Sequence, residues 1–371
     1  MNTATAAARR PRPWQHPQFW PAVTLLALLL LNWAFNPGFV SLGWRDGHLV
    51  GPLIDIANRA APLITVALGM TLVIATRGID ISVGAVVAIA AAVAATLIGG
   101  SLVIQDGQQV YVARTPMALA LLAALGVALL CGLWNGLLVG VAGIQPIIAT
   151  LILMVAGRGI AQLITQGQIV TIYYKPYFFI GAGYWLGLPF AFWLALGLAA
   201  VMGWLKHRSA LGLFIQASGA NPAAARLAGI RAGALLVGVY AFCGLTAGLA
   251  GLMISSNVKS ADGNNAGLLL ELDAILAVTL GGTSLLGGRF SLRGTVLGAL
   301  IIQTLTYAIY SMGVPPEVNL VVKAVVVGVV CLVQSPAWLQ WRPAPGPVDT
   351  PEAAAAPPPL TVAEQRPEAR P

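Results

Sequence analysis

Hydrophobic residues occur along this chain in long runs, and polar residues gather in short segments between them. Each run holds about twenty residues, the length at which a helix rising about 1.5 Å per residue crosses a hydrocarbon layer about 30 Å thick. We therefore predict an all-α polytopic membrane protein with about ten transmembrane helices. The predicted spans cover residues 19–35, 57–76, 80–99, 117–141, 146–165, 188–205, 233–255, 271–287, 294–313 and 317–334.

Composition and charge agree with this prediction and orient the chain. It is 58% hydrophobic and 9% charged, whereas soluble domains are about 45–50% apolar and about 25% charged. Ten spans place both termini on one side of the membrane. A cytoplasmic N-terminus puts thirteen basic residues in inner segments and five in outer ones, in agreement with the positive-inside rule. The five are Arg45, Arg59, Arg114, Lys175 and Lys259. The net charge of +8 therefore reflects sidedness and does not indicate a nucleic-acid partner.

Three segments follow from this topology. Residues 1–18 form a cytoplasmic N-terminal segment, residues 19–342 form one transmembrane domain, and residues 343–371, rich in Pro and Ala, form a disordered cytoplasmic tail. The first span resembles a signal peptide, but no small-residue cleavage pattern follows Phe35. We expect it to stay attached as a signal anchor.

Motifs of catalysis are missing from the sequence. It has no G-x-x-x-x-G-K-[ST] loop to hold nucleotide phosphates, no H-E-x-x-H and no G-x-S-x-G. Cys131, Cys243 and Cys331 lie within apolar runs and lack metal-ligand spacing. We predict no catalytic residue, no metal and no cofactor, so any ATP hydrolysis that drives transport belongs to another chain.

The most informative segment is the basic inner loop of residues 206–233. It predicts a short helix, because Asn221 is a favoured N-cap, Pro222 suits the first helical position and Gly229 suits a left-handed end. About two turns result, too few to cross a bilayer. Two interpretations stay open. The helix either docks into a motor protein, with Leu227 exposed for contact, or rests on lipid headgroups while Arg226 snorkels.

Polar residues within the spans are candidates for a transport pathway, because charged groups in lipid are costly and tend to face a bundle interior. Hydrogen bonding between helices, and snorkelling of Lys323, are the alternative roles. The candidates are Asn135, Gln145, Arg158, Gln162, Gln303, Asn319 and Lys323.

Four segments resemble a known family, the ribose, xylose and arabinose type of bacterial sugar ABC permease. They read ALGMTLVIATRGIDISVGA (67–85), IQPIIATLILMVAGRG (144–159), GANPAAARLAGI (219–230) and ELDAILAVTLGGTSLLGGRFSLRGTVLGALI (271–301). Within this family the galactofuranose permeases are most similar, through SADGNNAGLLLELDAILAV, LGGRFSL and PPEVNLVVKAVVV. One departure is Arg77, where the family commonly has a second glycine.

The resemblance implies a function and a set of partners. It implies half of a two-permease pore in the bacterial inner membrane, supplied from outside by a periplasmic sugar-binding protein and driven by a cytoplasmic ABC ATPase. Galactofuranose systems use two different permeases, so we expect a heterodimer with a related chain. The ATPase would dock at the segment matching Gly219–Ile230, with Gly219, Asn221, Pro222, Ala224, Arg226, Leu227 and Gly229 as its coupling residues.

Rival functions have weaker support. A permease for ribose or arabinose differs only in its sugar. An ion-coupled secondary transporter would need carboxylates inside the spans, and here only Asp80, Glu271 and Asp273 lie close, near span ends. A branched-chain amino-acid ABC permease would share the docking loop but need charged groups for a zwitterion. A membrane enzyme would need acidic metal-binding clusters.

Overall fold

A computed structural model of the chain describes residues 18–45, 47–105, 108–313, 315, 318, 320–322, 324, 325, 328, 329 and 332. The predicted tail of residues 343–371 and almost all of the N-terminal segment lie outside the described residues. So do Asn319 and Lys323, two candidates for the pathway, within the tenth predicted span.

Eight long helices follow the predicted spans along the described part of the chain. They are α1 (Phe19–Phe35), α2 (Pro52–Ala75), α3 (Val83–Ile98), α4 (Met117–Gly140), α5 (Pro146–Thr165), α7 (Phe190–Arg208), α10 (Ala232–Val258) and α12 (Leu292–Ser311). Six of them, all except α1 and α3, are long and apolar enough to cross a membrane. The prediction of an all-α membrane protein is confirmed.

One predicted span is not a continuous helix. The prediction covered residues 271–287, whereas α11 (Leu270–Leu280) has 11 residues and is therefore about 16 Å long, roughly half a membrane crossing. Residues 281–291 form a loop in which Gly282, Gly287 and Gly288 have positive φ. Apolar composition extended the prediction too far, because the glycines favour conformations that end a helix.

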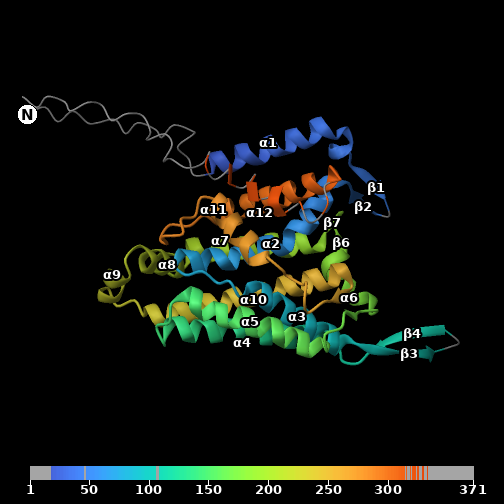
Figure 1. Ribbon diagram of the computed structural model, residues 1–371, viewed down its shortest axis with the longest axis horizontal. Helices are drawn as coiled ribbons and strands as arrows, with labels where there is room; N and C mark the ends of the chain where they lie inside the picture. Colours follow the sequence, from blue (N-terminus) through green and yellow to red (C-terminus); the bar gives the residue numbers. More distant parts are fainter. Residues whose placement is uncertain are drawn as a thin grey trace, which may run out of the picture.

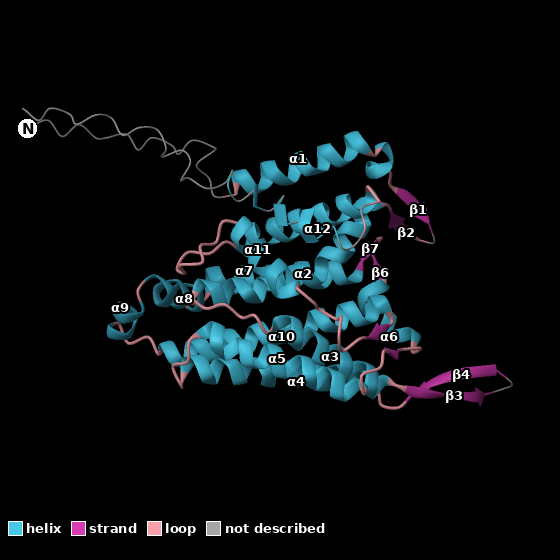
Figure 2. Cartoon of the chain, viewed as in Figure 1, coloured by secondary structure: helices cyan, strands magenta, loops and turns pink. Residues whose placement is uncertain are grey.

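The helices lie side by side along one direction, and the two ends of the bundle differ (Figure 1). The short helices α8 (Leu211–Ala220) and α9 (Pro222–Leu227) lie at the end where α1 begins. Two-stranded hairpins lie at the opposite end (Figure 2), formed by β1 (Gly43–Arg45) with β2 (His48–Val50), β3 (Gly100–Gln105) with β4 (Gln108–Ala113), and β6 (Tyr184–Trp185) with β7 (Leu188–Pro189). We call these the α9 end and the hairpin end.

Four further short elements complete the list of helices and strands in the described residues. The one-turn η2 (Pro37–Val40) follows α1, and α6 (Lys175–Ala182) precedes β6. Strand β5 (Val170–Thr171) pairs antiparallel with β8 (Ser260–Ala261), so that the chain after α5 is joined to the chain after α10.

Helices α2, α3 and α10 form the buried centre, and small residues allow close packing there. Gly244 of α10 faces α4 so closely that a Cβ atom on it would lie 2.4 Å from the carbonyl oxygen of Ala128. This close approach explains the glycines of α10, since helices in lipid associate through packing of small residues rather than through a hydrophobic driving force. Cys243 is buried and Cys131 is partly buried, and both are free thiols.

Candidate functional site

Helix α9 forms where the sequence predicts it. The Asn221 side chain accepts a hydrogen bond from the backbone N–H of Ala224 at 3.1 Å, and Pro222 is the first helical residue. Gly229 has φ of 84°, and the N–H of Ile230 donates to the carbonyl of Ala225 at 3.0 Å. Both helix ends are therefore satisfied by local bonds.

The outer face of α9 is open. Leu227 is 92% exposed, whereas Ala225, on the face toward the bundle, is 4% exposed. Asn221, Ala224, Arg226 and Gly229 are also exposed, and α9 is the outermost element of its end (Figure 1). A large apolar side chain beside an arginine on a capped helix is suited to contact with another protein.

The base of α9 is held by Arg77, from the loop between α2 and α3. Its Nε atom donates to the carbonyl of Gly219 at 2.5 Å, and its Nη2 atom donates to the carbonyl of Ala220 at 2.6 Å. Gly219 and Ala220 are the last two residues of α8, directly before the N-cap Asn221. Carbonyls at a helix C-terminus lack intrahelical donors and favour a cation, and Arg77 supplies both the donors and the charge.

The loop between α11 and α12 also reaches the C-terminus of α8. The N–H of Gly288 donates to the carbonyl of Ala75 at 2.9 Å. Gly219 lies between these two, since a Cβ atom there would lie 1.8 Å from the Ala75 oxygen and 2.5 Å from the Gly288 nitrogen. We call this contact of residues 75–77, 219–220 and 287–288 the α9 junction.

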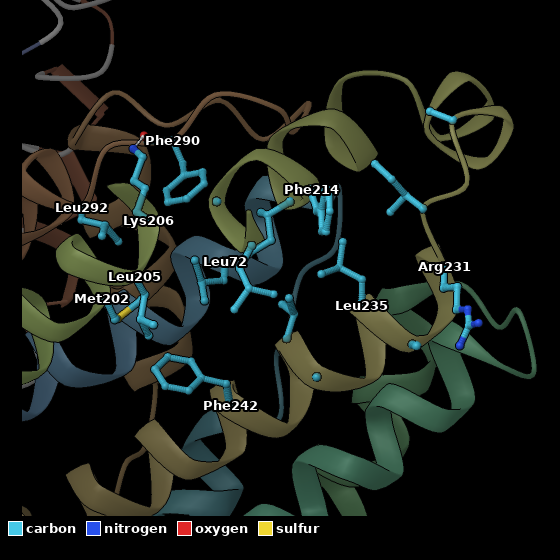
Figure 3. A pocket seen from close by; sticks show the side chains of 18 of the residues that line it. Leu72, Met202, Leu205, Lys206, Phe214, Arg231, Leu235, Phe242, Phe290 and Leu292 are labelled. Atoms are coloured by element: carbon cyan, nitrogen blue, oxygen red, sulfur yellow. Dashed lines mark hydrogen bonds between the residues drawn. The ribbon is translucent and has the colours of Figure 1, made fainter. Parts of the chain in front are cut away.

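An apolar cavity of about 700 Å³ lies on another side of α8. Its walls come from α2, α7, α8, α10, the segment after α9, and the start of α12 with the residue before Ser291. Figure 3 shows side chains that line it, Leu72, Met202, Phe214, Leu235, Phe242 and Phe290 among them. Lys206 and Arg231 are the polar side chains in this lining, and the Lys206 ammonium donates to the Phe290 carbonyl at 2.6 Å. Because sugar hydroxyls need several polar partners, this cavity is not suited to a sugar.

Asn135, a predicted pathway residue, is fully buried in a polar cluster with Asp80 and Ser82. Its Nδ2 atom donates to Ser82 Oγ at 2.8 Å and lies 3.4 Å from Asp80 Oδ1, which also accepts from the N–H and the hydroxyl of Ser82 at 3.0 and 2.6 Å. We call these three residues the Asp80 cluster. It joins the start of α3 to α4, so in this structure Asn135 links helices.

Arg158 and Gln162, two more predicted pathway residues, lie together against the segment that enters α11. Arg158 Nη1 donates to the carbonyl of Ala266 at 2.6 Å, and Gln162 Nε2 donates to Asn264 Oδ1 at 2.6 Å. Asp262 folds this segment by accepting from the N–H groups of Asn264 and Asn265. We call Arg158, Gln162 and residues 262–271 the α11 junction.

Sequence reasoning placed two carboxylates, Asp80 and Glu271, near span ends and did not count them among the pathway residues. Asp80 is 1% exposed and Glu271 is 4% exposed, because α3 and α11 both begin inside the protein. Glu271 Oε2 lies against Gly84 of α3 and has no hydrogen-bond partner among the described residues. Polar residues that interrupt apolar runs at residues 76–82 and 262–273 were the available signal.

The other predicted pathway residues stand apart from these clusters. Gln145 is exposed at the start of α5, and Gln303 is partly buried on α12. Within the described residues, no group of three His, Cys, Asp or Glu side chains is placed to hold a metal ion.

Comparison with known proteins gives this arrangement a family. The family model described as "Branched-chain amino acid transport system / permease component" matches residues 53–331. The chain belongs to this permease family. The permease is 49% identical over 335 residues to the galactofuranose transporter permease YtfT of Escherichia coli K12, covering 90% of this chain and 93% of that protein.

Other relatives carry other sugars in their names. The permease is 40% identical to the fructose import permease FruF of Bifidobacterium longum, over 85% of this chain and 87% of that protein. It is 36% identical to the ribose import permease RbsC of Escherichia coli K12, over 90% and 99%. No solved structure matches.

These findings confirm that the chain is the permease subunit of a bacterial sugar ABC importer in the inner membrane, and not an enzyme. Membership of such an importer implies an ATPase and a binding protein as partners. The family description names amino-acid transport, but the relatives above are named for sugars. The ion-coupled and enzymatic rivals are set aside.

Proposed function

We propose that this permease carries galactofuranose. The observation that supports the proposal is the ranking of similarity over nearly the whole chain, with 49% identity to a galactofuranose permease against 40% and 36% for fructose and ribose permeases. The segment SADGNNAG at residues 260–267 contributes to the α11 junction, so part of that resemblance lies where the chain enters the interior.

We also propose that α9 is the docking site of the ATPase, and that the α9 end is cytoplasmic. Three observations support this role. The helix is capped at both ends, Leu227 and Arg226 face outward, and the segments predicted to be cytoplasmic around residues 77, 208 and 289 lie at the same end. A helix whose ends are both capped presents an ordered surface to a docking protein.

A related second permease completes the proposed pore. The outward sides of α4 and α5 carry large exposed apolar residues, including Leu122, Leu130, Ile152, Val155 and Leu163. Such faces suit lipid or another membrane helix. Co-expression with a related permease, followed by mass measurement of the purified complex, tests for one copy of each, and two copies of this chain would contradict the heterodimer.

The substrate is tested by reconstituting the permease with its partner chains in liposomes. Sugar-stimulated ATP hydrolysis and uptake are measured with galactofuranose, galactopyranose, fructose, ribose and arabinose, each presented with the binding protein. We expect the largest stimulation with galactofuranose. Stimulation by ribose or fructose but not by galactofuranose would show that the importer carries another sugar.

A further inference from the structure

The loop between α2 and α3 contains a residue in a conformation that its side chain does not favour. Arg77 has φ of 66° and is not a glycine. This left-handed region is unfavourable for a residue with a Cβ atom. Glycine would fit the backbone better, so the arginine side chain has to be explained by what it contacts.

Those contacts lie at the root of α9. The guanidinium bonds the carbonyls of Gly219 and Ala220 through two different nitrogen atoms. Two donors fixed in one plane hold both the position and the direction of the α8 terminus. A displacement of α9 therefore pulls on the loop of residues 76–82 as well.

The same loop is attached to the interior at its other end. Gly78 packs against the hydroxyl of Tyr240 from α10, and Asp80 and Ser82 bond Asn135 of α4. Within seven residues the loop thus joins α9 to the start of α3 and to the two helices beside it. Buried hydrogen bonds of this kind resist being broken singly.

The loop between α11 and α12 is attached to the same place through the bond from Gly288 to Ala75. The α9 junction therefore joins the loop that follows α2 to the loop that follows α11. On another side of α8 lies the apolar cavity of about 700 Å³. The coupling segment is thus bonded to both loops, and the cavity lies between α8, α10 and the Phe290 end of the second loop.

We propose that Arg77 is the positioning residue that transmits the movement of α9 to the start of α3 and to the loop of residues 281–291. This inference rests on the proposed docking of the ATPase at α9. Arg77 touches neither sugar nor nucleotide. It acts through the two carbonyl groups of α8.

The substitution Arg77→Gly separates this role from folding. Glycine adopts φ of 66° without strain, so the variant should insert, melt within a few degrees of wild type and still co-purify with the ATPase. Although the family commonly has glycine at this position, in this chain the variant loses both bonds to the α8 terminus. We expect sugar transported per ATP hydrolysed to fall severalfold, with weaker stimulation of hydrolysis by the sugar-loaded binding protein. Arg77→Lys, with a single point donor, should give an intermediate ratio.

The matched control is Arg208→Gly. Arg208 is the last residue of α7, at the same end, exposed, and its side chain makes no hydrogen bond to the described residues. Its loss removes the same charge and should leave the transport ratio unchanged. A wild-type ratio in Arg77→Gly would overturn the proposal, and so would an equal loss of uptake and hydrolysis together with a lower melting temperature.

Failure of the underlying function is distinguishable. If a variant lacking Asn221–Leu227 still binds the ATPase, docking at α9 is wrong. If that deletion abolishes ATPase binding while Arg77→Gly keeps the wild-type transport ratio, docking stands and only the role of Arg77 is wrong.

Discussion

The α9 junction and the α11 junction both hold a backbone segment in place through an arginine, but the two segments lead to different parts of the molecule. In each, an arginine donates to backbone carbonyls at the end of a short helix or in the segment that leads into one. Arg77 bonds the C-terminus of α8, which leads to the exposed helix α9. Arg158 bonds Ala266, on the way into the interior, where α11 begins.

The difference lies in what each junction leaves unsatisfied. Next to the α9 junction, the helix that follows it carries an exposed apolar side chain, that of Leu227. At the α11 junction the unsatisfied group is a polar one, the Oε2 atom of buried Glu271, which has no hydrogen-bond partner among the described residues. One arrangement is suited to receiving a protein. The other keeps a polar group inside the membrane domain, where such a group is costly unless it is paired and is therefore a candidate for function.

Deleting Asn221–Leu227 should have the largest effect of the changes considered, and it should affect the α9 side alone. Because the ATPase loses its foothold, we expect uptake to fall to background while the protein still inserts, and Arg226→Glu should act in the same direction. Uptake in proteoliposomes and co-purification of the ATPase are the measurements. Arg45→Glu, an equal charge reversal at the hairpin end, is the control and should keep ATPase binding. Normal uptake by the deletion variant would refute the coupling role.

Gly219→Val should damage the α9 junction alone. The added side chain meets the Ala75 carbonyl and the Gly288 N–H, and overpacking of this kind costs about 1–3 kcal/mol. We expect a lower melting temperature in detergent and lost coupling. Gly238→Ala is the control, because a Cβ atom there meets nothing within 4 Å. Equal melting temperatures for the Gly219→Val variant and wild type would show that the close approach is not rigid.

Arg158→Leu should damage the α11 junction and spare the other. The partly buried Ala266 carbonyl loses its donor, at a cost of about 1 kcal/mol. Melting temperature and uptake should fall while ATPase binding stays at the wild-type level. Gln145→Leu, an exposed change at the start of the same helix, should alter the free energy of unfolding by less than about 0.5 kcal/mol. Loss of ATPase binding in Arg158→Leu would show that the junctions are not separable.

Glu271→Gln should have the smallest effect on folding. Because Oε2 has no hydrogen-bond partner among the described residues, replacing the carboxyl by an amide should change the free energy of unfolding by about 1 kcal/mol or less. Thermal melting measures this, with uptake assayed in parallel. A much larger loss of stability would mean that the carboxylate itself is needed, as a counter-charge for Arg158.

Local patterns predicted α9 well, and long-range contacts could not be read from them. Asn221, Pro222 and Gly229 act within a few residues of one another, so their spacing alone predicts the capped helix. The bond from Arg77 to Gly219 joins residues 142 positions apart. Charge sorting separated the segments into two sets, and the structure places them at two ends of the bundle.

The sequence predicted the end of α11 and the buried starts of α3 and α11 least well. Hydropathy treats residues 271–287 as one apolar run, although the chain leaves the helix at Gly281. It also places Asp80 and Glu271 near a membrane surface, because it assumes that every apolar span begins at that surface. Both residues are buried, since α3 and α11 start within the protein.

The exposure of Leu227 has a consequence for the life of the subunit before assembly. A newly inserted permease without its ATPase displays a bare leucine on a protruding, preformed helix. Binding of the ATPase at α9, as proposed above, would cover this leucine, so its exposed fraction should fall when the importer assembles.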